Sequence, residues 1–385
     1  MAERYPVGEH SRIKLVINAI PLLNIGTGIG TYIQCTYAAL ENEFKHKIQA
    51  GYFDGFRVSK HKPGGPSDLD RWSSRVDLFW KLPAFPALAL RIISHWQREL
   101  CFRKAAKGYD IYHEAAFFPF VPPRPSKTVF TLHDLSLIRF PEFHPKERVL
   151  FSRLFMRRRC AHVDQFLTDS HFVKREIQQY LGIDEDRIKV IPLAHDATIF
   201  HPRNYGDVEE TKRRYMLPDK YFITVGSGDP RKNMGIIPLA LKAADLDIPL
   251  VVAGWSGWTE KSVQQNHIIP LGYVPNEDLA RLYSGALALI YPSLYEGFGL
   301  PILEAMACGC PVICSRAASI PEVASGAALY LGDPKNRKEL ANLMRQITSD
   351  KLLRQRLSQL GLERATRFSW EKTAQQTFST FEELI

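Results

Sequence analysis

The sequence predicts an α/β protein made of two Rossmann-like, doubly wound parallel-sheet domains, and three observations support this fold class. The chain has 385 residues, too many for one ordinary core and enough for two domains of about 180 to 200 residues each. Short strands rich in β-branched residues alternate with helical stretches throughout, as in parallel sheets covered by helices on both faces. The alternation breaks once, at residues 192–202, and then restarts, which indicates a linker between two similar sheets.

The predicted elements follow this division. The first domain covers residues 1–196, with strands at residues 14–19, 48–53, 111–113, 128–132, 165–168 and 189–192. The second covers residues 197–367, with strands at residues 221–226, 249–254, 268–271, 286–291 and 311–314. Residues 368–385 form a final helix, for which Ser369 is a suitable N-cap.

Composition and the apolar runs narrow the class of protein. With 45% hydrophobic and 24% charged residues, the chain has the composition of a soluble globular protein. The N-terminal residues are polar and lack the apolar core of a signal peptide. The longest apolar run, residues 82–90, contains Pro83 and Pro86 and is well short of the roughly 20 residues that span a bilayer. We therefore expect a cytoplasmic protein.

The cysteines and acidic pairs do not predict a metal site. Six cysteines in a chain of this length form no disulfide framework, and Cys308 and Cys310 have no histidine or carboxylate at metal-ligand spacing. Three Asp-x-Asp triplets fall in expected surface turns or helix ends, at Asp68/Asp70, Asp184/Asp186 and Asp245/Asp247. We expect reduced thiols, no metal and no cofactor.

The most informative segment is the glycine-rich turn after the strand at residues 286–291. Gly297 and Gly299 let the main chain approach a ligand closely, and Pro301 suits the first turn of a helix. That helix begins at about Leu300, and its free N–H groups favour an anion such as a diphosphate. Glu296 lies in the turn, where it can accept hydrogen bonds from sugar hydroxyls. A helix cap beside an ordinary surface glutamate is the alternative.

The segment resembles a known signature. The two carboxylates Glu296 and Glu304, separated by seven residues, resemble the glutamate-x7-glutamate motif of the retaining GT-B glycosyltransferases of family 4. The resemblance implies two domains facing a central cleft, a nucleotide-diphospho-sugar donor, no required metal and retention of the anomeric configuration. It implies that Gly297, Phe298, Gly299 and Leu300 bind the donor and that Glu304 takes the ribose hydroxyls. It also implies that the final helix crosses back onto the first domain, the alternative being a helix packed on the second domain alone.

Two weaker segments match the same family. The turn at residues 26–31, with Gly28 and Gly30, resembles the N-terminal glycine loop near the donor diphosphate, and the segment around Tyr273 and Val274 resembles the part whose backbone holds the nucleobase. Glycine turns of this kind also occur in dehydrogenases, and Asp54 follows the next strand. An NAD-dependent oxidoreductase therefore remains a second possibility.

A histidine and an aspartate follow the strand at residues 128–132. Polar residues at the carboxyl edge of an open α/β sheet lie where ligands collect. His133 matches the active-site histidine of the family, which contacts the donor sugar, and Asp134 is the expected orienting group. The alternative is a structural histidine with its hydrogen bonds satisfied.

Arg231 and Lys232 follow the first strand of the second domain. A guanidinium offers a bidentate fork to a phosphate and an ammonium offers a point charge, so this pair is predicted to stabilise the departing diphosphate. Many relatives carry an arginine directly after the first glycine of this turn, where this chain has Ser227. We assign the arginine role to Arg231. A surface turn with solvated charges is the alternative.

The basic surplus is concentrated in the first half of the chain. Residues 1–200 contain 29 Lys and Arg against 21 Asp and Glu. Residues 71–107 alone contain eight basic and two acidic residues interleaved with aromatic ones, and a second basic stretch covers residues 148–159. Such segments suit an anionic membrane surface. We expect the first domain to lie peripherally on the inner membrane face, the alternative being helices that pack their aromatic residues inward.

Taken together, the sequence predicts a retaining hexosyltransferase, with mannose from GDP-mannose as the leading donor. The expected acceptor is a saccharide, polyprenyl-diphosphate-linked, in surface polysaccharide or lipopolysaccharide synthesis, and no nucleic acid partner is expected. His133, Glu296, Arg231 and Lys232 are the predicted catalytic residues. The rival classes are the NAD-dependent oxidoreductase and a non-catalytic, membrane-associated scaffold.

Overall fold

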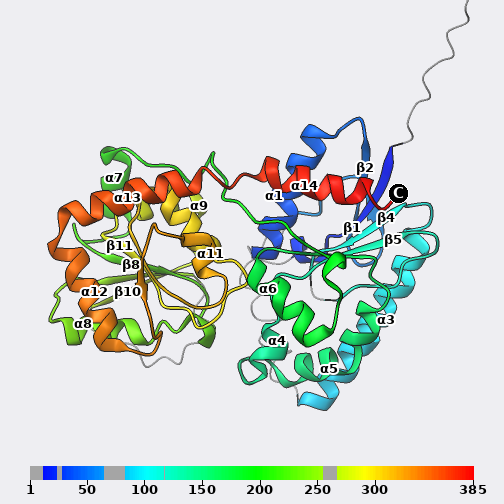
Figure 1. The fold of residues 1–385 in the computed structure, drawn as a ribbon, viewed down its shortest axis with the longest axis horizontal. Helices are drawn as coiled ribbons and strands as arrows, with labels where there is room; N and C mark the ends of the chain where they lie inside the picture. The colour runs from blue at the N-terminus through cyan, green and yellow to red at the C-terminus, as the bar shows by residue number, and fades with distance from the viewer. Residues whose placement is uncertain (1–11, 24–27, 65–82, 117, 255–266) are drawn as a thin grey trace, which may run out of the picture.

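The computed structural model describes residues 12–23, 28–64, 83–116, 118–254 and 267–385. Two α/β domains lie next to each other, each with a central sheet covered by helices (Figure 1). The predicted fold class is confirmed, because both sheets are doubly wound and almost entirely parallel. Predictions made for residues 26–27, for the Asp68/Asp70 triplet and for residues 71–82 of the basic segment lie outside the described residues.

The strands and helices have the following bounds. The strands are β1 (Ile13–Asn18), β2 (Ile48–Phe53), β3 (Val58–Ser59), β4 (Ile111–Glu114), β5 (Lys127–Thr131), β6 (Gln165–Thr168), β7 (Ile188–Val190), β8 (Phe222–Val225), β9 (Leu250–Ala253), β10 (Ile268–Gly272), β11 (Ala288–Tyr291), β12 (Val312–Ser315) and β13 (Leu329–Leu331). The α-helices are α1 (Gly28–Glu43), α3 (Ala84–Ala105), α4 (Ser136–Arg139), α5 (Lys146–Cys160), α6 (His171–Glu176), α7 (Tyr205–Arg214), α8 (Ile236–Ala244), α9 (Asn276–Gly285), α10 (Leu300–Ala307), α11 (Ile320–Ala324), α12 (Arg337–Ser349), α13 (Lys351–Ala365) and α14 (Trp370–Glu382).

The strand order places a topological switch point in each sheet. The first sheet has the order β3-β2-β1-β4-β5-β6-β7, and the second has the order β10-β9-β8-β11-β12-β13. All described pairs are parallel except β2 with β3. In open sheets of this type ligands bind beyond the carboxyl ends of the strands where the order reverses. These points lie between β1 and β4 in the first sheet and between β8 and β11 in the second.

The predicted strands agree with the observed ones to within two residues at either end. The strands β3 and β13 were not predicted. Each consists of only two or three residues, lies at the edge of its sheet and is incompletely buried, so neither produces the apolar run that marks a central strand. None of the described helices combines the length and apolar character needed to cross a bilayer.

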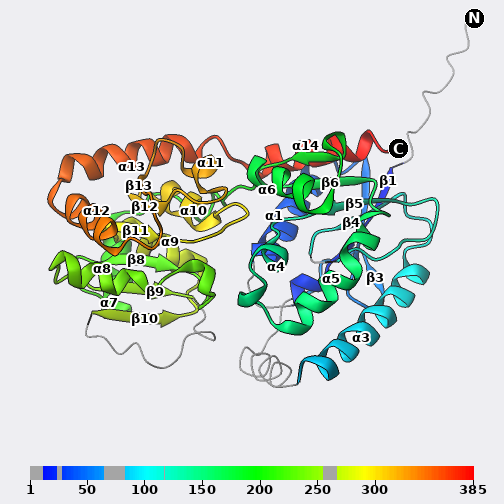
Figure 2. The same ribbon diagram turned by 60° about the horizontal axis from the view of Figure 1, so that its bottom comes forward.

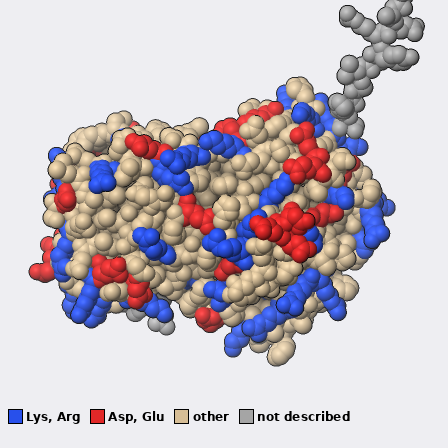
Figure 3. All heavy atoms as spheres, in the orientation of Figure 1, with Lys and Arg blue, Asp and Glu red and all other residues tan. Residues whose placement is uncertain are grey.

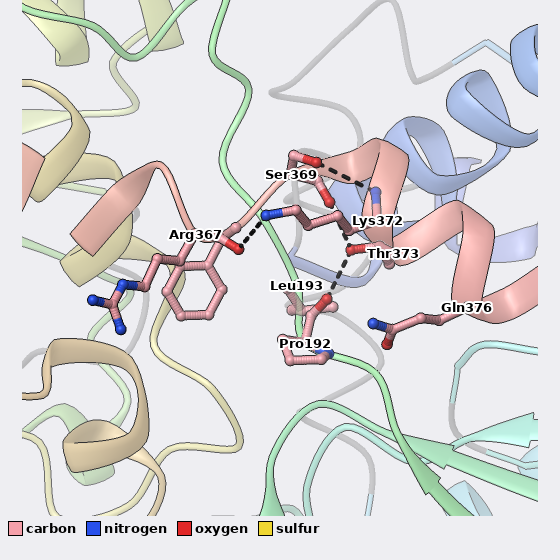
Figure 4. A pocket seen from close by; sticks show the side chains of 8 residues that line it. Pro192, Leu193, Arg367, Ser369, Lys372, Thr373 and Gln376 are labelled. Atoms are coloured by element: carbon pink, nitrogen blue, oxygen red, sulfur yellow. Dashed lines mark hydrogen bonds between the residues drawn. The ribbon is translucent and has the colours of Figure 1, made fainter. Parts of the chain in front are cut away.

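The chain crosses between the domains twice, and the two crossings are bonded to each other. The first crossing follows β7 and the second joins α13 to α14 (Figure 4). The Thr373 hydroxyl donates to the Pro192 carbonyl at 2.7 Å, and the Lys372 ammonium donates to the Arg367 carbonyl at 3.2 Å. Ser369 caps α14 through its side chain. The Thr373 hydrogen bond thus joins the start of α14 to the first crossing, whereas the Lys372 bond lies within the second crossing.

The last helix, α14, packs on the first domain. It lies along α1, far from α12 of the second domain (Figures 1 and 2). Phe378 stacks on Phe44 with ring centroids 4.0 Å apart, and Phe381 packs edge-on to His113 at 5.6 Å. Lys47 forms an ion pair with Glu382 at 3.2 Å. Aromatic side chains thus contribute directly to the contact between α14 and the first domain.

Replacing Phe381 with alanine should destabilise the first domain by about 3–5 kcal/mol, the usual cost of removing a buried phenylalanine. Phe381 is fully buried, so the change leaves a cavity between α14 and the sheet. The measurement is urea unfolding followed by circular dichroism. Leu352→Ala, at a residue of α13 that is 77% exposed, is the control and should change stability by at most about 0.5 kcal/mol. Equal effects of the two substitutions would contradict this account.

Candidate active site

The predicted site residues gather where loops follow the strands at and next to the switch points. The loop after β8 carries Arg231 and Lys232, and the loop after β11 carries Glu296 and the glycine turn. His133 follows β5 in the first domain. Helices α6 and α11 meet at the domain boundary (Figure 2), where Glu322 of α11 accepts hydrogen bonds from the backbone N–H groups of His171 and Phe172 at 2.8 and 2.7 Å.

Lys232 and Glu296 form a half-buried ion pair at the switch point of the second sheet. The Lys232 ammonium lies 2.9 and 3.0 Å from the two carboxylate oxygens of Glu296, and 2.9 Å from the hydroxyl of Tyr291 at the end of β11. Burial alone would lower the pKa of Lys232, but the charge of Glu296 outweighs it and the pKa is raised. Lys232 is therefore held in its cationic form. Its stem packs over Gly226, where an added Cβ would lie 3.4 Å from the lysine Cγ.

Arg231 connects the two domains. Its guanidinium bonds Asp229 of its own loop at 2.6 to 3.2 Å and Asp134 of the first domain at 3.2 Å. Burial acts to raise the pKa of Asp134, but the Arg231 charge and hydrogen bonds to Ser136 outweigh it and lower the pKa. The Arg231 carbonyl also accepts a hydrogen bond from the N–H of Leu294 at 2.7 Å. Arg231 is thus already paired with two carboxylates, Asp229 and Asp134, whereas Lys232 is paired with one, Glu296.

His133 is oriented by Asp169, not by Asp134 as predicted. The Nδ1 atom of His133 lies 2.7 Å from the Asp169 carboxylate, whereas Asp134 accepts from the Ser136 N–H at 2.9 Å and binds Arg231. The Nε2 atom is buried and has no hydrogen-bond partner among the described residues. The ring of Tyr32 packs against the imidazole with centroids 4.8 Å apart. Asp169 therefore occupies Nδ1, and Nε2, which lies buried near the backbone of Ala115, is the ring nitrogen left for a ligand.

The role of Asp169 follows from the pairing of two strands and not from a local sequence motif. Residues 168–171 have the pattern of a helix cap, and Ser170 does cap α6. However, β5 pairs with β6 in a register that sets Thr131 opposite Leu167. Two residues further along each chain, this register sets His133 opposite Asp169. Two polar residues at equivalent positions beyond neighbouring parallel strands lie side by side.

The glycine turn brings the two domains into backbone contact. A Cβ added to Gly297 would lie 1.9 Å from the His133 carbonyl oxygen, so only glycine fits there. The Ser170 hydroxyl donates to the Gly297 carbonyl at 2.9 Å, and the Ser319 hydroxyl lies 2.8 and 3.1 Å from the carbonyls of Glu296 and Phe298. Gly299 precedes α10 with a φ of 106°, a left-handed conformation that favours glycine.

Glu304 is a half-buried carboxyl group on α10, which begins at Leu300. No described residue donates a hydrogen bond to its side chain. Burial raises its pKa from 4.5 to about 7. Burial and the charge of Asp196 raise the pKa of the Cys35 thiol on α1 to about 11; Lys62 opposes this rise and Glu304 adds to it. A carboxyl group in this state is suited to accept hydrogen bonds from a ligand.

The weaker predicted segments lie at the margins of this arrangement. Gly28 is the first residue of α1, with open space around it, and Gly30 is buried within the same helix. Tyr273 is exposed and Val274 buried, directly after β10, which is two strands away from β8. No group of three or more histidine, cysteine or acidic residues that could hold a metal ion is found in the described parts of the chain.

Comparison with known proteins identifies the family. Residues 207–364 match the model of glycosyl transferases group 1, and residues 55–199 match that of glycosyltransferase family 4. The chain is 34% identical over 300 residues to O-antigen chain mannosyltransferase B of Escherichia coli, an alignment that covers 74% of this chain and 77% of the relative. The chain belongs to the family 4 glycosyltransferases. The predicted family is confirmed.

Further similarities agree with this assignment. The enzyme is 31% identical over 351 residues to O-antigen chain mannosyltransferase RfbU of Salmonella typhimurium, covering 86% of this chain and 90% of the relative. Its fold resembles that of Anabaena HepE in complex with UDP and glucose, with a TM-score of 0.65 and 16% identity over 96% of this chain and 99% of the other. The GT-B fold predicted from the resemblance is thus confirmed. Family membership also decides against the oxidoreductase and the non-catalytic scaffold.

Gly297→Ala should separate the two domains, because the new methyl group cannot lie 1.9 Å from the His133 oxygen. Small-angle X-ray scattering should show a larger radius of gyration, and transferase turnover should fall by a factor of about 10², since a displacement of 1 Å at a reacting centre costs about this much. Gly235→Ala is the matched control, because an added Cβ there meets nothing within 4 Å. A Gly297→Ala enzyme with unchanged scattering and activity would refute the contact.

Asp169→Asn should lower the pKa of His133. Burial alone would lower this pKa below 6.5, but the charge and hydrogen bond of Asp169 raise it above that value. The pair therefore stabilises the fold fully below about pH 6.5 and less as the pH rises through the higher folded-state pKa. Imidazole NMR titration measures the shift, with Asp186→Asn, an exposed carboxylate, as control. An unchanged titration of His133 in Asp169→Asn would show that Asp169 does not hold its charge.

Proposed function

We propose that this glycosyltransferase transfers mannose from GDP-mannose, with retention of configuration, to a saccharide acceptor in the synthesis of a surface polysaccharide such as the lipopolysaccharide O-antigen. The names of the two relatives, both O-antigen chain mannosyltransferases, support the sugar and the pathway. The observation that carries the proposal is the Lys232–Glu296 pair at the switch point of the second sheet. It puts a fixed cation and a carboxylate at the edge where ligands of such sheets bind.

Each polar residue has a role in donor binding under this proposal. The diphosphate lies against the N-terminus of α10 after Gly299, where free N–H groups favour anions. The ribose hydroxyls bind the Glu304 carboxylate, and the sugar hydroxyls bind Glu296. The base lies against the backbone of Tyr273 and Val274, and the glycine turn at Gly28 and Gly30 covers the phosphates. In UDP-bound HepE the same fold binds a nucleotide.

The proposed chemistry is charge stabilisation. The bond between the sugar C1 and the donor β-phosphate breaks as the acceptor oxygen forms its bond to C1 on the same face of the sugar. The acceptor proton passes to an oxygen of the released nucleoside diphosphate, so no protein base is required. Lys232 neutralises the developing phosphate charge, without a metal ion. Arg231 assists when the diphosphate displaces Asp134 from its guanidinium, and the His133 Nε2 atom contacts the donor sugar.

The proposed acceptor is a saccharide linked to a polyprenyl diphosphate. A lipid carrier would keep the growing saccharide at the surface of the inner membrane. The enzyme would then work as a peripheral protein on the inner face of that membrane.

The test is a transferase assay with purified enzyme. Only one of GDP-mannose, UDP-glucose and ADP-glucose should yield a nucleoside diphosphate in the presence of a saccharide acceptor, and the proposal names the first. Lys232→Ala should lower kcat by a factor of about 10² to 10³, the usual cost of losing one charge-stabilising group. Lys335→Ala, at an exposed lysine of the second domain, is the control. A fully active Lys232→Ala enzyme would contradict the scheme, and turnover of another donor would contradict the sugar.

A further inference from the structure

Helix α3 exposes large apolar side chains along one face. Phe85, Ile93, Trp96 and Leu100 are 78%, 54%, 58% and 61% exposed. At 100° per residue these four side chains fall within an arc of about 80° around the helix axis. The opposite face holds the buried Phe102 and packs on the first domain. An apolar stripe this continuous on an exposed helix marks an interaction surface.

Helix α5 runs beside α3 in the same direction and extends this surface. Arg91 of α3 pairs with Glu147 of α5 at 3.3 Å, and Glu99 of α3 pairs with Arg159 of α5 at 2.6 Å. These two ion pairs lie on the facing sides of the helices and join them at two points along their length. The α3–α5 face is defined as the exposed stripe of α3 together with the outer residues of α5, which are Arg153, Leu154, Arg157 and Arg158.

The charge of the α3–α5 face is entirely positive. Among the described residues, Arg153, Arg157 and Arg158 form no ion pair. The sole acidic residues of the two helices, Glu99 and Glu147, are turned inward and already bound to Arg159 and Arg91. Figure 3 shows Lys and Arg side chains in a row over the region of α5, with almost no acidic side chains among them. Leu154, 55% exposed, adds an apolar group within this row.

We propose that the α3–α5 face docks the enzyme on an anionic lipid bilayer. Aromatic and aliphatic side chains enter the boundary between headgroups and acyl chains, while neighbouring arginines bind lipid phosphates. A protein partner would have to supply acidic groups opposite three unpaired arginines and also cover the apolar stripe, whereas an anionic bilayer presents both features at once. The face therefore fits a membrane better than a protein.

The position of the α3–α5 face connects docking to the active site. Helix α4, which packs on α5, follows His133 and Asp134 directly. When the enzyme docks through α3 and α5, the short helix α4 connects the His133 loop to the docked surface. The proposal rests on the proposed function for its purpose, the delivery of a lipid-linked acceptor, but binding to a bilayer is measurable without any donor or acceptor.

The experiment is co-sedimentation of the protein with phosphatidylcholine vesicles, with and without about 30% phosphatidylglycerol. Phosphatidylglycerol supplies the anionic surface that attracts basic segments. Binding should require the anionic lipid and weaken as salt is added. Trp96→Gln with Leu100→Gln should weaken binding at least about 10-fold, since two apolar side chains leave the interface. Arg153→Gln with Arg157→Gln and Arg158→Gln should weaken it by about fivefold for each charge removed.

The matched controls lie on the second domain. Leu352→Gln removes an apolar side chain that is 77% exposed, and Lys335→Gln with Arg337→Gln and Lys338→Gln removes three exposed cations. Both controls should bind vesicles like the unaltered protein.

Absence of vesicle binding at low salt, or equal losses in the controls, would overturn the proposal. The oligomeric state provides a further check. If the protein is a dimer and the double substitution Trp96→Gln with Leu100→Gln makes it a monomer without changing vesicle binding, the face joins two copies of the chain and the proposal is overturned. Donor turnover measured in parallel with a water-soluble acceptor separates a failure of docking from a failure of the proposed function.

Discussion

The close approach of the Gly297 backbone to the His133 carbonyl is the constraint on which the geometry of the site depends. It sets the distance between the loop after β11 and the loop after β5, and therefore between residues that belong to different sheets. Hydrogen bonds from both sides reinforce it. The Tyr295 hydroxyl accepts from the Leu135 N–H at 3.0 Å and bonds the Glu176 carboxylate. Glycine is required here because of its missing side chain, since the neighbouring atom is a backbone oxygen that cannot rotate away.

Charge pairing organises the polar side chains of the site. Each cation of the site faces a carboxylate, and one pair, Arg231 with Asp134, joins the two domains. Half-buried pairs of this kind contribute little net stability, because desolvation offsets much of the attraction. They do fix side-chain positions. Under the proposed function, a diphosphate that binds Arg231 and Lys232 exchanges with these carboxylates, so its binding would be coupled to the contact between the domains.

Much of this arrangement could be predicted from the sequence. Apolar runs identified the central strands, because their side chains are buried on both faces of a covered sheet. The order of glycine, proline and glutamate around Gly297 identified the start of α10, and the donor-binding role of this loop stays a prediction. The assignment of Asp134 as the partner of His133 was wrong, because adjacency along the chain does not determine which side chains meet. Asp169 lies 36 positions away along the chain, and only the pairing of β5 with β6 brings it beside the imidazole.

The contacts across the domain boundary could not be predicted either. Nothing in the local pattern of Glu322 indicates that it accepts hydrogen bonds from the start of α6, because this bond depends on the relative placement of two separately folded sheets. The two short edge strands escaped prediction because their few residues are only partly buried. Local patterns thus identified elements and loops, whereas pairings across sheets required the three-dimensional structure.

The location of α14 has a consequence for synthesis of the protein. Its aromatic side chains cover α1, yet in the chain they follow the whole second domain. On the ribosome, a nascent chain can form the sheet around β1 early, but the surface of α1 stays uncovered until α14 has left the exit tunnel. The first domain therefore completes its fold only after the second domain has been translated.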